Sequence, residues 1–181
     1  MIRRGKSTWL LMMVLLIPLA GCWPVSTSLL PPGEEIIEHG TPTDTLTCST
    51  PAAVARVDTV IRPGNAAVTL RAGGTTLSLK DSAFSGERRI VLQQNSGQAF
   101  NTAIDGETGR TPPPRMRKSA TLTFDTSRCT AEELEQADDW YVWRLNPTPG
   151  LSQKLRTHDN SGSSREIWTV IDSTSTFMIA N

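Results

Sequence analysis

The chain has 181 residues, of which 38% are hydrophobic, and it carries 18 basic and 18 acidic side chains. This length suffices for one domain with a buried core, and a neutral chain without a basic cluster argues against nucleic acid as a partner. The two histidines, His39 and His158, lie at no ligand spacing from a cysteine, so the sequence predicts no metal site and no bound cofactor.

The first 22 residues have the three parts of a secretory signal. Arg3, Arg4 and Lys6 form a positive segment, residues 9–19 form an apolar core, and Leu19-Ala20-Gly21-Cys22 ends the signal. The apolar run is too short to span a bilayer and is followed by a processing site. The tetrapeptide resembles the lipobox of bacterial lipoproteins, which implies cleavage before Cys22 and acylation of its thiol and its new amino terminus. An ordinary cleaved signal with an incidental cysteine is the alternative.

The lipobox implies a cell-envelope protein that is attached to the membrane through lipid on Cys22. Two or three acyl chains together make an effectively permanent anchor, whereas a single chain binds only marginally. Residue 23 is Trp23, not the Asp that tends to retain lipoproteins in the inner membrane of Gram-negative bacteria. We therefore expect the outer membrane, on the side that faces the periplasm.

Residues 22–53 are rich in Pro, Thr and Ser and show no sustained periodicity. This composition predicts a disordered, partly polyproline-like linker between a signal peptide at 1–21 and a folded domain at 54–181. At about 3.1 Å per residue, roughly 30 residues could hold the domain up to about 90 Å from the membrane.

Cys48 and Cys129 form an even pair once Cys22 is assigned to the lipid. In an oxidising compartment such a pair is expected to be joined. A bridge that closes a loop of about 80 residues would stabilise the fold by roughly 4 kcal/mol on the chain-entropy account. Two free thiols are the alternative, because sequence does not show that the two backbones approach.

Beyond residue 53, short runs of alternating apolar and polar residues are separated by turn residues. Two such runs flank Gly73-Gly74, which predicts a hairpin. The spacing predicts an all-β, antiparallel β-sandwich. One short connecting helix is expected after Thr130, which would cap it in a capping box with Glu133. Further strands are expected at 89–93, 99–104, 120–125, 140–145, 153–157, 166–171 and 175–180.

The order of these motifs resembles a known module. The motifs are Gly73-Gly74 with residues 75–79, residues 90–92, residues 120–125, an acidic helix that ends at Leu134, residues 140–145, and residues 166–180. They are similar to the ZU-five-type β-sandwich module of zonula occludens proteins, netrin receptors, ankyrins and some bacterial envelope proteins. The chain departs from bacterial members at residues 80–84 and 173–175, where they usually carry a Pro-Pro-Gly-Ala-like turn and a His-Phe-Ser triplet. The resemblance implies an interaction or structural domain without catalytic residues, and an envelope protein as its partner.

Trp140 and Trp168 are the candidate contact surface. Period two places Tyr141, Trp143 and Leu145 on one face of their strand and Trp140 on the other. We expect the first three to fill the core and Trp140 to lie near the surface, with Trp168 on the penultimate strand. The pattern favours core and cross-strand packing of these aromatic residues, and the alternative is an exposed aromatic platform that binds a protein or a glycan.

Two short patterns and one histidine are catalytic or metal-binding candidates. Asp159-x-Ser161-x-Ser163 matches the metal-dependent adhesion site, but in an all-β chain it is typical of a type I turn. Asp138 and Asp139 could form a glycosidase pair, but they adjoin the helix end. The sequence has no Gly-x-Ser-x-Gly motif that would supply a nucleophilic serine for His158 to activate. The sequence therefore predicts a non-catalytic interaction module, with a glycan-binding module as the alternative and a hydrolase after it.

The lipobox generates a direct test at Cys22. The Cys22→Ser variant should remain uncleaved or mislocalised and should no longer incorporate labelled fatty acid, because the acyl-accepting thiol is gone. Metabolic labelling and fractionation of membranes measure both properties. Normal processing and membrane attachment of this variant would contradict the lipoprotein assignment.

Overall fold

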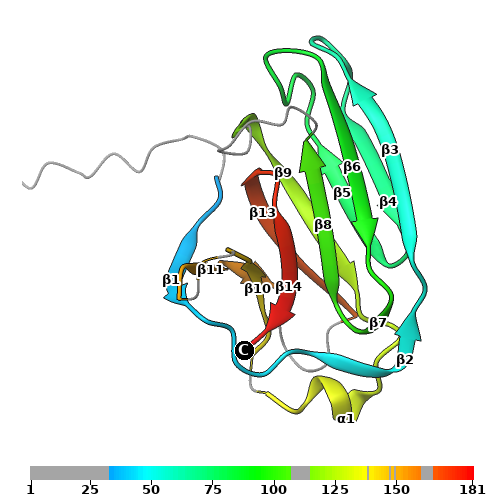
Figure 1. Ribbon diagram of the computed structural model, residues 1–181, viewed down its shortest axis with the longest axis vertical. Helices are drawn as coiled ribbons and strands as arrows, with labels where there is room; N and C mark the ends of the chain where they lie inside the picture. The colour runs from blue at the N-terminus through cyan, green and yellow to red at the C-terminus, as the bar shows by residue number, and fades with distance from the viewer. Residues whose placement is uncertain (1–32, 107–114, 138, 147, 149, 160–164) are drawn as a thin grey trace, which may run out of the picture.

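The structure is a computed structural model that describes residues 33–106, 115–137, 139–146, 148, 150–159 and 165–181. These residues form two antiparallel sheets packed against each other, with a small third sheet and one short helix at one end (Figure 1). The expected all-β antiparallel sandwich with one connecting helix is confirmed. The signal peptide and Cys22 lie outside the described residues.

All strand pairs in the described sheets are antiparallel. The larger sheet has seven strands, in the order β1 (Ile36–Gly40), β11 (Ser152–Leu155), β10 (Tyr141–Arg144), β14 (Thr176–Ala180), β8 (Asn101–Gly106), β6 (Arg88–Gln94) and β3 (Ala55–Ile61). The smaller sheet has five, in the order β12 (Thr157–His158), β13 (Glu166–Ser173), β9 (Arg115–Asp125), β5 (Thr75–Leu79) and β4 (Val68–Ala72). The third sheet pairs β2 (Thr47–Ala52) with β7 (Gly97–Ala99).

The core lies between the inner faces of the two large sheets. Leu122 and Phe124 of β9 are fully buried on one side, and Ile90 and Leu92 of β6 are fully buried on the other. Burying each such side chain stabilises the fold by about 1.5–3 kcal/mol relative to exposure. Because side chains alternate along a strand, this burial also decides which residues point outward from each sheet.

Two local predictions are confirmed. Strands β4 and β5 form the expected hairpin, and Gly73 in its turn has φ +58°. The positive φ therefore favours glycine at this position, and a Cβ atom there would also come within 2.7 Å of the Gln94 amide and displace it. Helix α1 (Ala131–Leu134) begins after Thr130, whose side chain forms the expected capping box with Glu133.

The predicted linker is wrong for its described part, because residues 36–40 and 47–52 are strands of the domain. Strand β1 pairs with β11, and β2 pairs with β7. The periodicity is missing because β1 is an edge strand whose side chains are nearly all exposed. Its partner strand lies more than a hundred residues later in the chain, so no local signal marks the pairing. The folded domain therefore begins well before residue 54.

The predicted orientation of β10 is also wrong. Trp140 is 1% exposed and belongs to the core, and its Nε1–H donates to the Leu134 carbonyl oxygen at 2.7 Å. Trp143 lies on the opposite face but is buried too, beneath Lys154 and against Gly40 of β1. Its Nε1 is buried without a hydrogen-bond partner among the described residues. Since both faces of this strand are covered and both carry aromatic residues, alternation alone could not select the core face.

The burial of Trp140 predicts a large loss of stability in the Trp140→Ala variant. Removing a fully buried indole and its hydrogen bond should lower the free energy of unfolding by about 3–5 kcal/mol, as measured by urea unfolding. The half-buried Trp168 serves as the matched control, and Trp168→Ala should cost much less. Equal losses in the two variants would contradict the distinction between a core and a surface tryptophan.

Candidate functional site

Trp168 lies on the outer face of the five-stranded sheet, one strand in from its edge. The strand register places it opposite Thr123 of β9 and His158 of β12. The indole stacks on the His158 ring, with the centroids 4.0 Å apart and the planes inclined by 17°. Its Nε1–H donates to Asp159 Oδ2 at 2.7 Å. These contacts hold a half-buried indole in one orientation.

Two rows of side chains cross this outer face from strand to strand, and every member is exposed or half-buried. The rows follow the strand register and run through Trp168, Thr123, Thr76 and Arg71, and through Val170, Thr121, Ser78 and Thr69. We call these residues, together with His158, the outer hydroxyl face. The surface combines one oriented aromatic pair, a band of hydroxyl groups and one cation, a set suited to contacts with polar partners.

The structure does not bring the two predicted contact residues together. Trp168 lies on the outer hydroxyl face, whereas Trp140 is buried in the core against α1. The prediction of an aromatic platform formed by both tryptophans is therefore wrong, and only Trp168 remains a candidate contact residue. No local sequence pattern indicates the aligned hydroxyl rows, because their members come from four strands whose register is set by the fold.

A second cluster joins the segment just before β1 to β10 of the larger sheet and β13 of the smaller sheet. The Glu34 carboxylate, whose side chain is 3% exposed, lies 2.6 Å from Arg144 Nη1 of β10 and accepts the backbone N–H of Asp172 in β13 at 3.1 Å. Arg144 also donates to Gln153 Oε1 and to Ser173 Oγ. We call these residues the Glu34 cluster. It fixes the entry point of the chain onto the sandwich.

Burial and charge act in opposite directions on Glu34. Desolvation raises the pKa of its carboxyl group from 4.5 to about 7, while the Arg144 guanidinium and the Asp172 N–H act to lower it. A buried ion pair of this kind contributes little net stability, but leaving one partner unpaired is costly. Sequence reasoning missed this cluster because Glu34 and Arg144 are 110 residues apart and neither lies in a recognisable motif.

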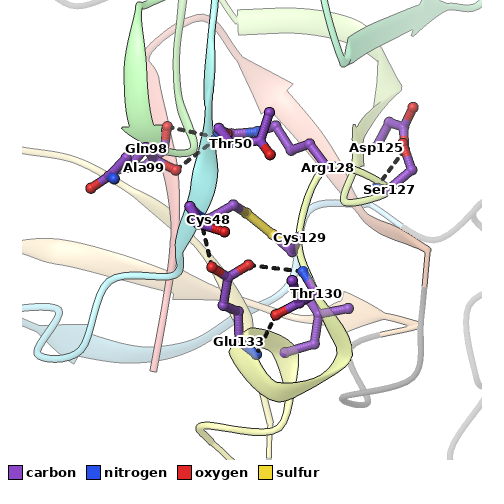
Figure 2. The surroundings of a disulfide bond; sticks show 12 residues. Cys48, Thr50, Gln98, Ala99, Asp125, Ser127, Arg128, Cys129, Thr130 and Glu133 are labelled. Carbon is purple, nitrogen blue, oxygen red and sulfur yellow. Dashed lines mark hydrogen bonds between the residues drawn. A yellow bond between two sulfur atoms is a disulfide. The ribbon is translucent and has the colours of Figure 1, made fainter.

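The expected disulfide between Cys48 and Cys129 is present, with Cα atoms 4.7 Å apart (Figure 2). It joins β2 to the loop that leads into α1. The neighbouring Arg128 guanidinium lies 4.1 Å above the Phe100 ring and donates to carbonyl oxygens of β2 and β7, among them Thr50 at 2.7 Å. The disulfide corner therefore holds the small third sheet against the sandwich.

Glu133 ties the helix cap to β2 beside the disulfide. Its carboxylate accepts the backbone N–H groups of Ser49 at 2.6 Å and Thr130 at 2.8 Å (Figure 2). The bond from Thr130, followed by those from Ser49, lowers the pKa of Glu133 to about 2. Cys48, Cys129 and Glu133 also form a group with metal-ligand spacing, but the two sulfur atoms are bonded to each other and provide no thiolate.

An open depression of about 660 Å³ lies where β8, β14 and the loop after β10 meet. Three segments line it: Ala103, Ile104 and Asp105; Leu145 and Asn146; and Thr174, Ser175 and Thr176. Its volume is in the range of small-ligand sites. Neither histidine is among these lining residues, since His158 stacks on Trp168 and His39 contacts Gln153.

The other patterns weighed from the sequence are only partly described. Asp139 is exposed and accepts the Tyr141 hydroxyl at 3.3 Å, while Asp138 lies outside the described residues. Ser161 and Ser163 of the Asp-x-Ser-x-Ser motif also lie outside them. The described Asp159 is engaged by the Trp168 indole.

Comparison with known proteins gives no relative for this chain: no protein-family model, no curated protein and no solved structure matches it. In the part of the chain that the structure describes, no helix is long and apolar enough to cross a membrane. Inferences about function therefore rest on the sequence motifs and on the surfaces described above.

The raised pKa of Glu34 predicts a specific dependence of stability on pH. Between about pH 4.5 and pH 7 the folded state keeps the Glu34 proton that the unfolded state has lost. The contribution of this proton to the free energy of unfolding is therefore complete below about pH 4.5 and is lost as the pH rises to about 7. Glu34→Gln should remove this component, which urea unfolding at about pH 5 and pH 8 measures.

Glu35→Gln is the matched control for this measurement, because Glu35 is exposed and pairs with Arg156 at the surface. It should leave the pH dependence of unfolding as in the wild-type protein. If all three proteins lose the same stability between the two pH values, the Glu34 carboxyl does not titrate as described.

Proposed function

We propose that this chain is a non-catalytic, lipid-anchored protein of the bacterial cell envelope whose β-sandwich serves as a structural or protein-interaction module. The anchor is supported by the lipobox-like Leu19-Ala20-Gly21-Cys22. The resemblance to the ZU-five-type module and the expected outer-membrane location, facing the periplasm, belong to the same proposal. Its contact surface is the outer hydroxyl face around Trp168.

The attachment of the N-terminal segment is the observation that supports a role close to the membrane. The Glu34 cluster fixes the chain to the sandwich only twelve residues after Cys22. Twelve extended residues span at most about 40 Å, less than half the reach expected for a free linker up to residue 53. A sandwich held this close to the membrane surface is placed to contact other components of the same envelope layer.

The outer hydroxyl face supports contact with a protein partner. Trp168 is half-buried and oriented by His158 and Asp159, so a partner would not have to order the side chain on binding. Oriented tryptophans of this kind carry much of the binding energy in protein interfaces. The surrounding threonines and serines supply donors and acceptors for a polar rim.

An envelope glycan is the second candidate ligand of the same face. The stacked pair of Trp168 and His158 next to rows of hydroxyl groups favours it, because indole rings stack on sugars and hydroxyl groups exchange hydrogen bonds with them. A flat site with two exposed tryptophans would be stronger support, but Trp140 is buried. A hydrolase has less support, because His158 is engaged with the indole and lies apart from the open depression.

The test is capture of partners from solubilised membranes by the full chain and by its Trp168→Ala variant. The variant should unfold close to the wild-type temperature, because the side chain is only half-buried, but it should lose at least about tenfold of its affinity for the captured envelope component. Binding to purified peptidoglycan fragments separates a glycan from a protein as the lost ligand.

The exposed Ile37 of β1 provides the matched control, since it is a surface apolar residue on the other large sheet. Ile37→Ala should leave capture unchanged. Capture that survives Trp168→Ala, or that is lost equally in both variants, would contradict the outer hydroxyl face as the contact surface.

A further inference from the structure

Within the described part of the chain, strand β3 is an edge of the larger sheet with no strand on its outer side. It pairs only with β6 among the described strands, in an unbroken register from Ala55 opposite Gln94 to Ile61 opposite Arg88. Figure 1 shows it at the outer side of the seven-stranded sheet, away from β1. Val54, just before the strand, and Val60, near its end, are 63% and 43% exposed. A long, regular edge with exposed apolar residues is a template for pairing with another strand.

The other edges of the two large sheets are less suited to such pairing. Strand β1 has a register shift between Ile36 and Glu38, and acidic residues at 35 and 38 flank its exposed isoleucines. Strand β12 has two residues, and β4 has five. Bulges, charges and shortness are the usual means by which edges avoid further pairing. Strand β3 has seven residues and no bulge.

The sequence of β3 is complementary to itself when it is read in the opposite direction. Around Val57, the residues at equal distances on either side are Ala55 and Thr59, Arg56 and Asp58, and Val54 and Val60. Arg56, Asp58 and Val60 point to the outer face, whereas Ala55 and Val57 pack against the core. Arg56 and Asp58 therefore face each other with opposite charges, Val54 and Val60 are both apolar, and Ala55 and Thr59 are both small.

We propose that β3 pairs with β3 of a second copy of this chain, antiparallel about a two-fold axis at Val57. In this register Arg56 of each copy lies opposite Asp58 of the other, and Val54 lies opposite Val60. Directly opposite residues in an antiparallel pair have Cα atoms about 4.5–5.5 Å apart, close enough for both contacts. The interface is isologous and closes as a dimer, and it joins the two seven-stranded sheets into one.

The charges select this register over its neighbours. A shift by two residues in one direction places Asp58 opposite Asp58, and in the other direction it places Arg56 opposite Arg56. Like charges directly opposite each other destabilise a strand pair. Arg89 of β6 already orients the Asp58 carboxylate through bonds of 2.5–3.0 Å. The Arg89 bond also keeps the pKa of Asp58 below its usual value, so Asp58 is charged at neutral pH.

The test uses the full chain in a non-ionic detergent, with its mass measured by light scattering corrected for the detergent. The wild-type chain should become dimeric as its concentration is raised to about 100 µM. Arg56→Asp and Asp58→Arg should each weaken dimerisation at least about tenfold, because each variant places like charges opposite each other in both pairs. An equimolar mixture of these two variants should dimerise again, because opposite charges then face each other.

The double variant Arg56→Asp with Asp58→Arg should dimerise by itself, since it exchanges the two charges within each pair. This variant and the thermal unfolding of each protein distinguish a lost interface from a lost fold. Arg117→Asp, an equal change of charge at an exposed residue of β9, should leave dimerisation unchanged.

Several outcomes would overturn the proposal. A wild-type chain that stays monomeric up to that concentration has no such interface. Dimers that persist in both single variants use another surface. A mixture that stays monomeric while its folded components retain their wild-type unfolding temperatures shows that the charges of β3 do not meet across a two-fold axis.

Discussion

The burial of one face of each large sheet against the other is the constraint on which the remaining structure depends. Apolar residues such as Leu122 of β9 and Ile90 of β6 are fully buried, and each contributes about 1.5–3 kcal/mol on removal from water. Because strands alternate, this burial also turns a defined set of side chains outward. Trp168 and the hydroxyl rows point outward for the same reason that Ile167 and Leu122 are buried.

Long-range contacts determine how the N-terminal segment joins the sandwich. The Glu34 cluster links the start of β1 to β10 and β13, and the disulfide links β2 to the start of α1, 81 residues later. Both contacts reduce the freedom of the segment that would lead to the membrane anchor. The attachment supports the proposed function, because a chain anchored at Cys22 would then have a short connection to the sandwich instead of a long free linker.

The two proposed surfaces are geometrically independent. The outer hydroxyl face belongs to the five-stranded sheet, whereas the β3 edge belongs to the seven-stranded sheet. Pairing through β3 uses backbone groups and the side chains of Arg56 and Asp58, and none of the residues around Trp168. A dimer would therefore present two copies of the outer hydroxyl face, which would raise the affinity for any ligand with repeated binding sites through multivalency.

The sequence by itself determined the fold class, the Gly73-Gly74 hairpin, the capped helix at Thr130 and the pairing of Cys48 with Cys129. Each depends on a local pattern or, for the cysteines, on the expectation that an even pair in a secreted chain is joined. Only the tertiary structure decided that residues 36–52 belong to the domain, that Trp140 is buried, and that Glu34 meets Arg144. The first and the third depend on partners far apart in the chain, and the second depends on a choice between two similar strand faces. Sequence periodicity shows neither the distant partners nor the choice of face.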